Sequence, residues 1–336
     1  MRIVAYVALV LALVGNIVAV ATFLHVQNLY GLSSVGQPTQ LSVSGALIVP
    51  PTALDDAPVV TAKGQPGSRL TNINAPFTRE ELLVINNAST SFFITAAQMF
   101  LNNSIANRIS PDVSRVTSLV VNGKPSVVYL GAISCIFCGE NRWAMALALS
   151  RFGSFSQLFK GYSAILDGDV PTIYWRPAEY NATSAVDFGN FYTSKTINFL
   201  SIEYASQIAL GFQMQPLSYF VHQAQIANNQ PYLQAVAIIN NANNYQGTPY
   251  TIWGGYAVTH ANAVIFGNSS SASTSNFAAL THEQVFNEIA LPHDQFGWSE
   301  YAAADVYIAV LCASLHSTTG ICGASVIQQI QIAGGF

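Results

Sequence analysis

The sequence predicts an α/β domain with a central mixed sheet flanked by helices, an insertion and an N-terminal transmembrane helix. Three observations support this class: a β-hairpin signal, a strand that leads into a helix through Cys135-Ile136-Phe137-Cys138, and later segments that alternate between strand-like and helical patterns. The chain also has 19 Phe, 15 Tyr and 4 Trp to bury, so it has the material for a large core.

The hairpin is expected around Asn122-Gly123, because this dipeptide supplies the positive φ values of a type I′ turn. Residues 116–121 precede it and residues 126–130 follow it, and both segments are rich in apolar and β-branched side chains. The two cysteines come next, and an apolar-periodic helix then continues to Phe152.

Two segments indicate where helices begin. Thr78 stands three residues before Glu81, as in a capping box, and the helical pattern that follows is interrupted near Asn86, which predicts two short helices or one broken helix. Residues 281–284 (THEQ) open another helix. A buried helix is expected over residues 301–315, and further strands over residues 171–175, 196–202, 235–239 and 250–253.

The first segment predicts where the protein lies. Residues 3–24 form an apolar run, long enough to cross a bilayer, in which Asn16 is the only strongly polar side chain. Arg2 keeps the N-terminus cytoplasmic and places the rest outside. A cleaved signal peptide with a site at Ala19-Val20-Ala21 is the alternative, although the run exceeds the usual h-region. We therefore expect a single-pass anchor over 1–26, a linker or extended arm over 27–75 and a domain over 76–336, with the insertion around 179–231.

Four N-x-S/T sequences are candidate glycosylation acceptors in such a compartment. They begin at Asn87, Asn102, Asn181 and Asn268. Several would arise by chance in a chain rich in Asn, Ser and Thr, so they support the extracellular assignment only weakly.

Charge is scarce: 8% of residues are charged, against roughly 25% in an average chain. With 12 Lys+Arg, 16 Asp+Glu and no basic patch, nucleic-acid binding is excluded. A surface made of Ser, Thr, Asn and Gln stays hydrated when carboxylates are protonated. The composition therefore fits an acidic exterior, and equally an ordinary secreted protein.

The chemistry is concentrated in four cysteines. Cys135 is expected at a helix N-terminus, which lowers the pKa of a thiol, and Cys138 lies one turn further on, where it could resolve a mixed disulfide. A metal site is disfavoured because the chain has no second C-x-x-C, and we expect no metal and no cofactor. Cys312 and Cys322 are expected to form a structural disulfide in an oxidising compartment.

The motif and its surroundings resemble an uncharacterised family of membrane-anchored, extracytoplasmic thioredoxin-like proteins of archaea and actinobacteria. The resemblance rests on the C-x-x-C, on Arg142-Trp143 and on residues 148–153 (ALSRFG), and it extends over about residues 76–330. Residues 192–195 (YTSK), an extended segment that ends at Glu203 and the closing 309–326 block match as well. The resemblance implies a thioredoxin-like fold with a catalytic Cys135/Cys138 pair.

Three departures from that pattern concern proton transfer and substrate positioning. The family's Glu before the Arg is Asn141 here, with Glu140 one place earlier. The segment expected to carry a cis-proline, residues 235–240, has none, so Pro249 is the nearest candidate. Tyr129 stands where thioredoxins keep a buried acid.

Two functional classes follow. The first is a thiol-disulfide oxidoreductase, anchored outside the membrane, that acts on protein thiols or disulfides through Cys135 and Cys138. The second is a non-catalytic thioredoxin-like subunit that packs against neighbouring membrane or surface proteins and keeps the C-x-x-C as a fixed bridge.

Overall fold

The computed structural model describes residues 74–102, 112–132, 135–163, 170–176, 190–204, 222, 224–241, 249–259, 280–293 and 295–336. The predicted anchor and arm, two of the N-glycosylation candidates (Asn181 and Asn268) and parts of the predicted insertion lie outside these residues. Among the helices that are described, none is both long and apolar enough to span a bilayer.

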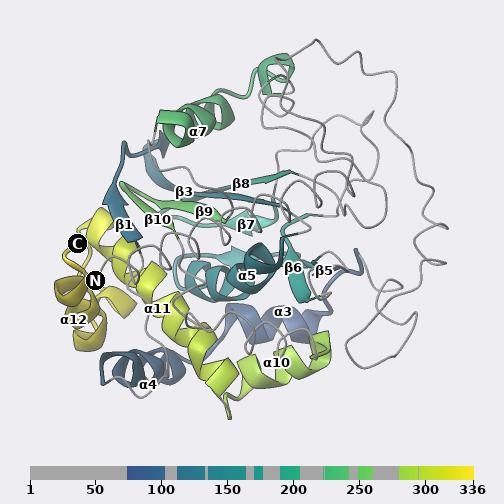
Figure 1. Cartoon of the computed structure of the whole chain (residues 1–336), viewed down its shortest axis with the longest axis vertical. Coiled ribbons are helices and arrows are strands. Elements are labelled where there is room, and N and C mark those ends of the chain that lie inside the picture. Colours follow the sequence, from purple (N-terminus) through teal and green to yellow (C-terminus); the bar gives the residue numbers. More distant parts are fainter. Residues whose placement is uncertain are drawn as a thin grey trace, which may run out of the picture. The chain divides into compact units, whose positions relative to one another are not determined.

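A six-stranded mixed sheet forms the centre of the domain (Figure 1). Its path runs β1-β10-β9-β3-β2, and β8 also pairs with β3. The strands are β1 (Asp112–Arg115), β2 (Val120–Val121), β3 (Lys124–Ala132), β8 (Asn198–Tyr204), β9 (Tyr250–Trp253) and β10 (Tyr256–Thr259). Strand β3 is parallel to β8 and antiparallel to β9, so the sheet is mixed, as predicted.

Two small ladders lie outside this sheet. Strand β4 (Ser154–Phe155) pairs with β7 (Tyr192–Thr193), and β5 (Phe159–Tyr162) pairs with β6 (Pro171–Tyr174). Part of the range predicted as an insertion therefore belongs to sheets, because β7 and the core strand β8 lie within 179–231.

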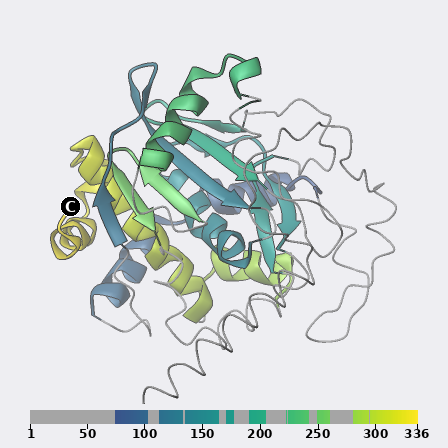
Figure 2. The same cartoon turned by 45° about the horizontal axis from the view of Figure 1, so that its top comes forward.

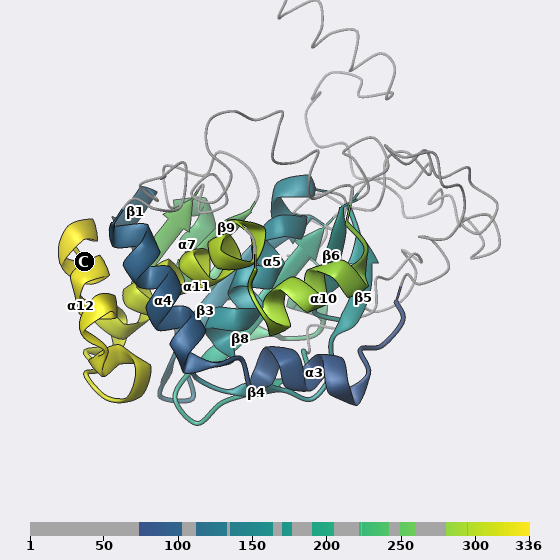
Figure 3. The same cartoon turned by 90° about the horizontal axis from the view of Figure 1, so that it is seen from below.

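Helices cover both faces of the central sheet. They are α3 (Arg79–Asn86), α4 (Thr90–Leu101), α5 (Ile136–Leu149), α7 (Gln230–Asn241), α10 (His282–Ala290), α11 (Gln295–Leu315) and α12 (Ser325–Gly334), with a 3-10 turn, η4 (Gly320–Gly323), before the last. Figure 2 shows the green α7 lying across the strands, and Figure 3 shows α3, α4, α10 and α11 together, with α7 behind them.

The two faces separate because side chains alternate along a strand. On β3, Val127 and Tyr129 belong to the larger core with α5 and α11, whereas Val128 and Leu130 belong to a smaller core with α7. Helix α11 is buried on all sides from 299 to 312, which is expected of a helix that is apolar all round.

Local signals explain several boundaries. The turn residues Asn122 and Gly123 have φ of 51° and 76°, which confirms the predicted hairpin. Thr78 and Thr281 both form complete capping boxes, at the starts of α3 and α10. The interruption predicted near Asn86 is the break between α3 and α4.

One element was predicted wrongly. Residues 235–239 form part of helix α7 and not a strand, so they cannot be the strand that carries a cis-proline. The helix packs on the sheet through Tyr232, Ala235, Val236 and Ile239, which are spaced at helical intervals. Its β-branched residues had favoured the strand interpretation.

Candidate functional site

The two cysteines lie at the start of α5, directly after the central strand β3. Cys135 is the N-cap residue, with extended backbone (φ −75°, ψ 125°), and its Sγ accepts a hydrogen bond from the backbone N–H of Cys138 at 3.3 Å. The sulfur thus occupies the position that a Ser or Asp oxygen usually takes at a helix start. The two sulfurs are not joined by a disulfide in this structure.

The two sulfurs differ in their access to solvent. Cys135 is half-buried, whereas Cys138 is 0% exposed. Phe137, between them, is 49% exposed. An accessible cysteine that receives the first helical N–H groups is favoured as a thiolate, and a shielded cysteine one turn later can react only with its neighbour.

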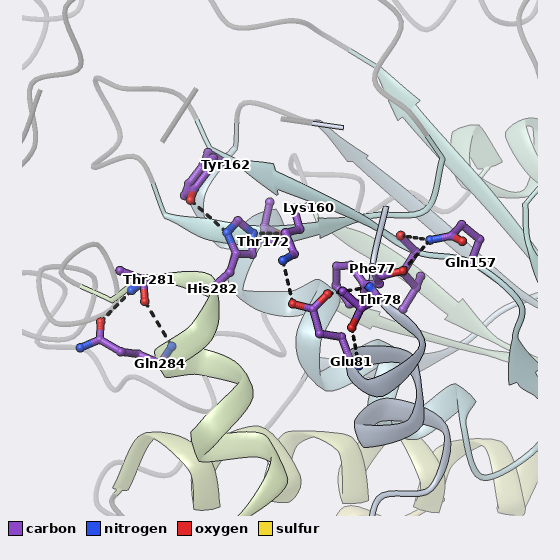
Figure 4. A network of polar contacts seen from close by, with 11 residues as sticks. Phe77, Thr78, Glu81, Gln157, Lys160, Tyr162, Thr172, Thr281, His282 and Gln284 are labelled. Carbon is purple, nitrogen blue, oxygen red and sulfur yellow. Dashed lines mark hydrogen bonds and ion pairs between the residues drawn. The ribbon is translucent and has the colours of Figure 1, made fainter. Parts of the chain in front are cut away.

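One hydrogen bond ties the first turn of α5 to β6, and a histidine of α10 holds β6 in turn; Figure 4 shows this His282 with its partners Tyr162 and Thr172. The hydroxyl of Thr172 on β6 donates to the carbonyl of Gly139 at 2.7 Å. His282 of α10 bonds the carbonyl of Thr172 with Nε2 and the hydroxyl of Tyr162 with Nδ1, each at 3.0 Å. A carbonyl only accepts, so Nε2 carries a proton. His282 is therefore a buried histidine whose two ring nitrogens both have hydrogen-bond partners.

Glu140, two residues after Cys138, is a buried acid. Its side chain is 1% exposed, and Oε1 has no hydrogen-bond partner among the described residues. Burial raises the pKa of Glu140 to about 8, and repulsion from the Cys135 thiolate acts in the same direction. The sequence placed an acid here without indicating that it would be buried beside the thiols.

The next residues of the motif are buried as well. Arg142 lies over the rings of Tyr129 and Tyr174, at 5.6 and 5.8 Å from the centroids, and also contacts the Thr172 hydroxyl at 3.4 Å. Trp143 donates from Nε1 to a backbone carbonyl of β6 at 3.0 Å. The Arg-Trp pair of the motif therefore belongs to the packing between α5 and the strands.

Helix α11 brings polar groups to the same interior. The amide of Asn141 donates to the hydroxyl of Tyr307 at 2.5 Å, which links α5 to α11. Burial raises the pKa of Tyr307 above its ordinary value. Glu300 and Asp305 are each 0% exposed. Sequence reasoning assigned these two acids no role, although Asp305 is the only charge within the apolar run 301–315.

Pro249 stands directly before β9. Its neighbour Tyr250 pairs with Leu130, near the end of β3 that leads to Cys135. The backbone register thus places Pro249 at the end of the sheet where β3 leads into the cysteine motif.

The remaining predicted sites are spread over the surface and the C-terminal helices. Asn87 and Asn102 are exposed and cap the C-termini of α3 and α4. Cys312 and Cys322 form a disulfide, with a Cα–Cα distance of 5.5 Å, between the last turn of α11 and η4. Within the described part of the chain, no group of three or more His, Cys, Asp or Glu residues could hold a metal ion.

Comparison with known proteins gives one match. No curated protein and no solved structure matches the chain. The family model described as "Domain of unknown function (DUF929)" matches residues 114–214, a segment that includes β3, both motif cysteines and β8.

Proposed function

We propose that this chain is a thiol-disulfide oxidoreductase of thioredoxin-like fold that acts outside the cytoplasm through Cys135 and Cys138. The observation that carries the proposal is the unequal placement of the two sulfurs, with Cys135 accessible at the N-cap of α5 and Cys138 fully buried behind it. A purely structural bridge would have no need of an accessible cysteine at a helix N-terminus.

Strand order supports the thioredoxin-like part of the proposal. The run β10-β9-β3-β8 places a parallel pair beside an antiparallel pair, and the motif follows the shared strand β3. Pro249 precedes β9 at the same edge, which is where a thioredoxin-like enzyme contacts its substrate chain. We extend the proposal to a membrane anchor over residues 3–24, whose apolar run supports it.

In the proposed reaction, the two thiols reduce a substrate disulfide. The Cys135 thiolate attacks one substrate sulfur, the substrate S–S bond breaks, and the other sulfur leaves as a thiolate. Cys138 then loses its proton and attacks Sγ of Cys135. The mixed disulfide breaks, the second substrate thiolate leaves, and the two electrons that reduce the substrate leave a Cys135–Cys138 disulfide. Oxidation of a substrate dithiol is the reverse sequence.

Glu140 is the proposed proton acceptor for Cys138. Once Cys135 is in a mixed disulfide, its negative charge is gone, and with it the repulsion that helps to raise the pKa of Glu140. The carboxyl group then ionises more readily at the step in which Cys138 must lose its proton. The acid that the family pattern places next to Arg142 is thus replaced by one a position earlier.

A trapping experiment tests the proposal. Cys138→Ser should accumulate mixed disulfides between Cys135 and a substrate protein that contains a disulfide, because the resolving thiol is missing. Cys135→Ser should form none. Non-reducing gels with peptide mapping read the outcome, and the Cys312–Cys322 disulfide is the internal control. If neither variant traps substrate and both only lose stability, the chain is the non-catalytic subunit and the oxidoreductase proposal is wrong.

A further inference from the structure

Two helices at the centre of the domain carry three carboxyl groups that water does not reach. Glu140 lies on α5, and Glu300 and Asp305 lie on α11; their side chains are 1%, 0% and 0% exposed. Both helices are enclosed, since α5 is buried from 138 to 149 and α11 from 299 to 312. The short Asp and Glu side chains therefore have no route by which to extend into solvent.

The carboxyl groups also lack side-chain partners within the described residues. Five of their six oxygens make no hydrogen bond: Oε1 of Glu140, both oxygens of Glu300 and both of Asp305. Two ion pairs that join described residues lie elsewhere, between Lys160 and Glu81 and between His293 and Glu288. A carboxylate buried without a partner costs several kcal/mol, whereas the protonated acid costs far less.

The charged groups around the three acids do not favour ionisation. Glu140 faces the Cys135 thiolate, and Glu300 faces Glu140, so in both cases like charges meet. The backbone N–H of Ala144 lowers the pKa of Glu300 and so partly offsets this repulsion. That N–H group, however, already donates to a backbone carbonyl within α5. For Asp305 burial raises the pKa, and the charge of its ionised form would in turn raise the pKa of Tyr301.

Cations and other titratable groups nearby are engaged elsewhere. The charge of Arg151 lowers the pKa of Tyr301, and its guanidinium lies over the ring of Phe93. The guanidinium of Arg142 lies over tyrosine rings on the strand side of α5. Helices α4 and α12 contain no Asp, Glu, Lys, Arg or His.

Helix α10, which packs against α11, contributes three titratable residues. His282 bonds Tyr162 and Thr172, Glu288 pairs with His293, and Glu283 is exposed. From the sheet, Tyr256 of β10 packs against this core, whereas Tyr250 of β9 belongs to the smaller core on the α7 side. On α11 itself, Tyr307 bonds Asn141 and, through its ring, stacks on Trp253 of β9.

We infer that the folded domain holds Glu140, Glu300 and Asp305 as neutral acids, so that it is built to fold in an acidic medium and loses stability as the pH rises through neutrality. The inference does not depend on the proposed thiol chemistry, because Glu300 and Asp305 take no part in it. The scarcity of charge points the same way: a chain with 8% charged residues relies little on surface ion pairs, which acid would break.

The sign follows from linkage. Burial raises the pKa of Glu140 to about 8 and raises the pKa of Glu300 and Asp305 well above their usual range. The folded state therefore binds more protons than the unfolded state above pH 4.5. The stability that these groups contribute is complete below about pH 4 and is lost as the pH rises toward their folded pKa values.

Denaturant unfolding of the full chain in detergent, at about pH 5 to 8.5, tests the inference. The unfolding equilibrium constant should rise about 100-fold or more over this range, since each pKa unit contributes a factor of about ten. Glu300→Gln and Asp305→Asn cannot ionise, so each should reduce that rise by about tenfold or more. Glu283→Gln removes an exposed carboxylate of α10 and should leave the pH profile as it is in the natural chain.

A stability that is constant or increases over the same pH range would overturn the inference. So would a result in which Glu300→Gln and Asp305→Asn lower stability by the same factor at every pH. The series is repeated with Cys135→Ser, which removes the thiolate but leaves Glu300 and Asp305 in place. A chain that traps no substrate yet keeps this pH profile contradicts only the proposed function.

Discussion

The two cysteine pairs lie at opposite ends of two helices that pack against each other. Cys135 and Cys138 stand at the N-terminus of α5 with no disulfide between them, whereas Cys312 and Cys322 are bonded where α11 ends. At the N-terminus, helical N–H groups and the helix dipole stabilise a thiolate; at the C-terminus, carbonyl groups disfavour one. We expect from this difference that the helix end, more than the presence of two cysteines, decides whether a pair is reactive or structural.

The sharpest test of this comparison is labelling. After brief mild reduction near neutral pH, Cys135 should react with iodoacetamide about 100-fold faster than either Cys312 or Cys322, because it is accessible and favoured as a thiolate. The latter two should stay bonded, since their side chains are 1% and 2% exposed. Mass spectrometry of timed digests measures the rates. Equal rates at all four sulfurs would remove the distinction between the two ends.

The second test removes the structural pair. The double variant Cys312→Ala/Cys322→Ala should lower the free energy of unfolding by roughly 2–3 kcal/mol, because the bond closes a loop with a sequence separation of 10. Substrate trapping by Cys135 should be unchanged. Chemical denaturation and the trapping assay are run on the same preparations. If trapping fails while the fold persists, the C-terminal disulfide also serves the thiol site.

Much of the architecture around the motif follows from local signals. The Asn122-Gly123 turn, the capping boxes at Thr78 and Thr281, and the strand-to-helix junction at Cys135 are all set by residues close in sequence. Such signals depend on backbone φ values and N–H groups within one turn, so they can be recognised without tertiary structure.

Long-range effects account for what the sequence did not reveal. Residues 235–239 are helical because Tyr232, Ala235, Val236 and Ile239 pack as one stripe on the sheet, which overrides their β-branched preference. The enclosure of α11 depends on helices distant in the chain. A sequence shows that Glu300 and Asp305 lie in or beside an apolar run, but it cannot show which side chains reach them in the folded domain.

The smallest effect concerns the link between the two helices. Tyr307→Phe removes the hydroxyl that accepts from Asn141 but keeps the ring, which stacks on Trp253 at 4.5 Å. The amide N–H of Asn141, which is 1% exposed, loses this acceptor, so the free energy of unfolding should fall by about 1–2 kcal/mol. Tyr256→Phe, at a half-buried position on β10, is the matched control and should change the free energy of unfolding by less than about 0.5 kcal/mol. Asn141 lies one turn after Cys138 on α5, but Cys135 is held at the N-cap by its own contact with the N–H of Cys138, so the labelling rate of Cys135 should stay within about twofold of the natural chain in both variants. A large change in that rate for Tyr307→Phe alone would mean that α11 positions the cysteine turn, and that the two helix ends are not independent.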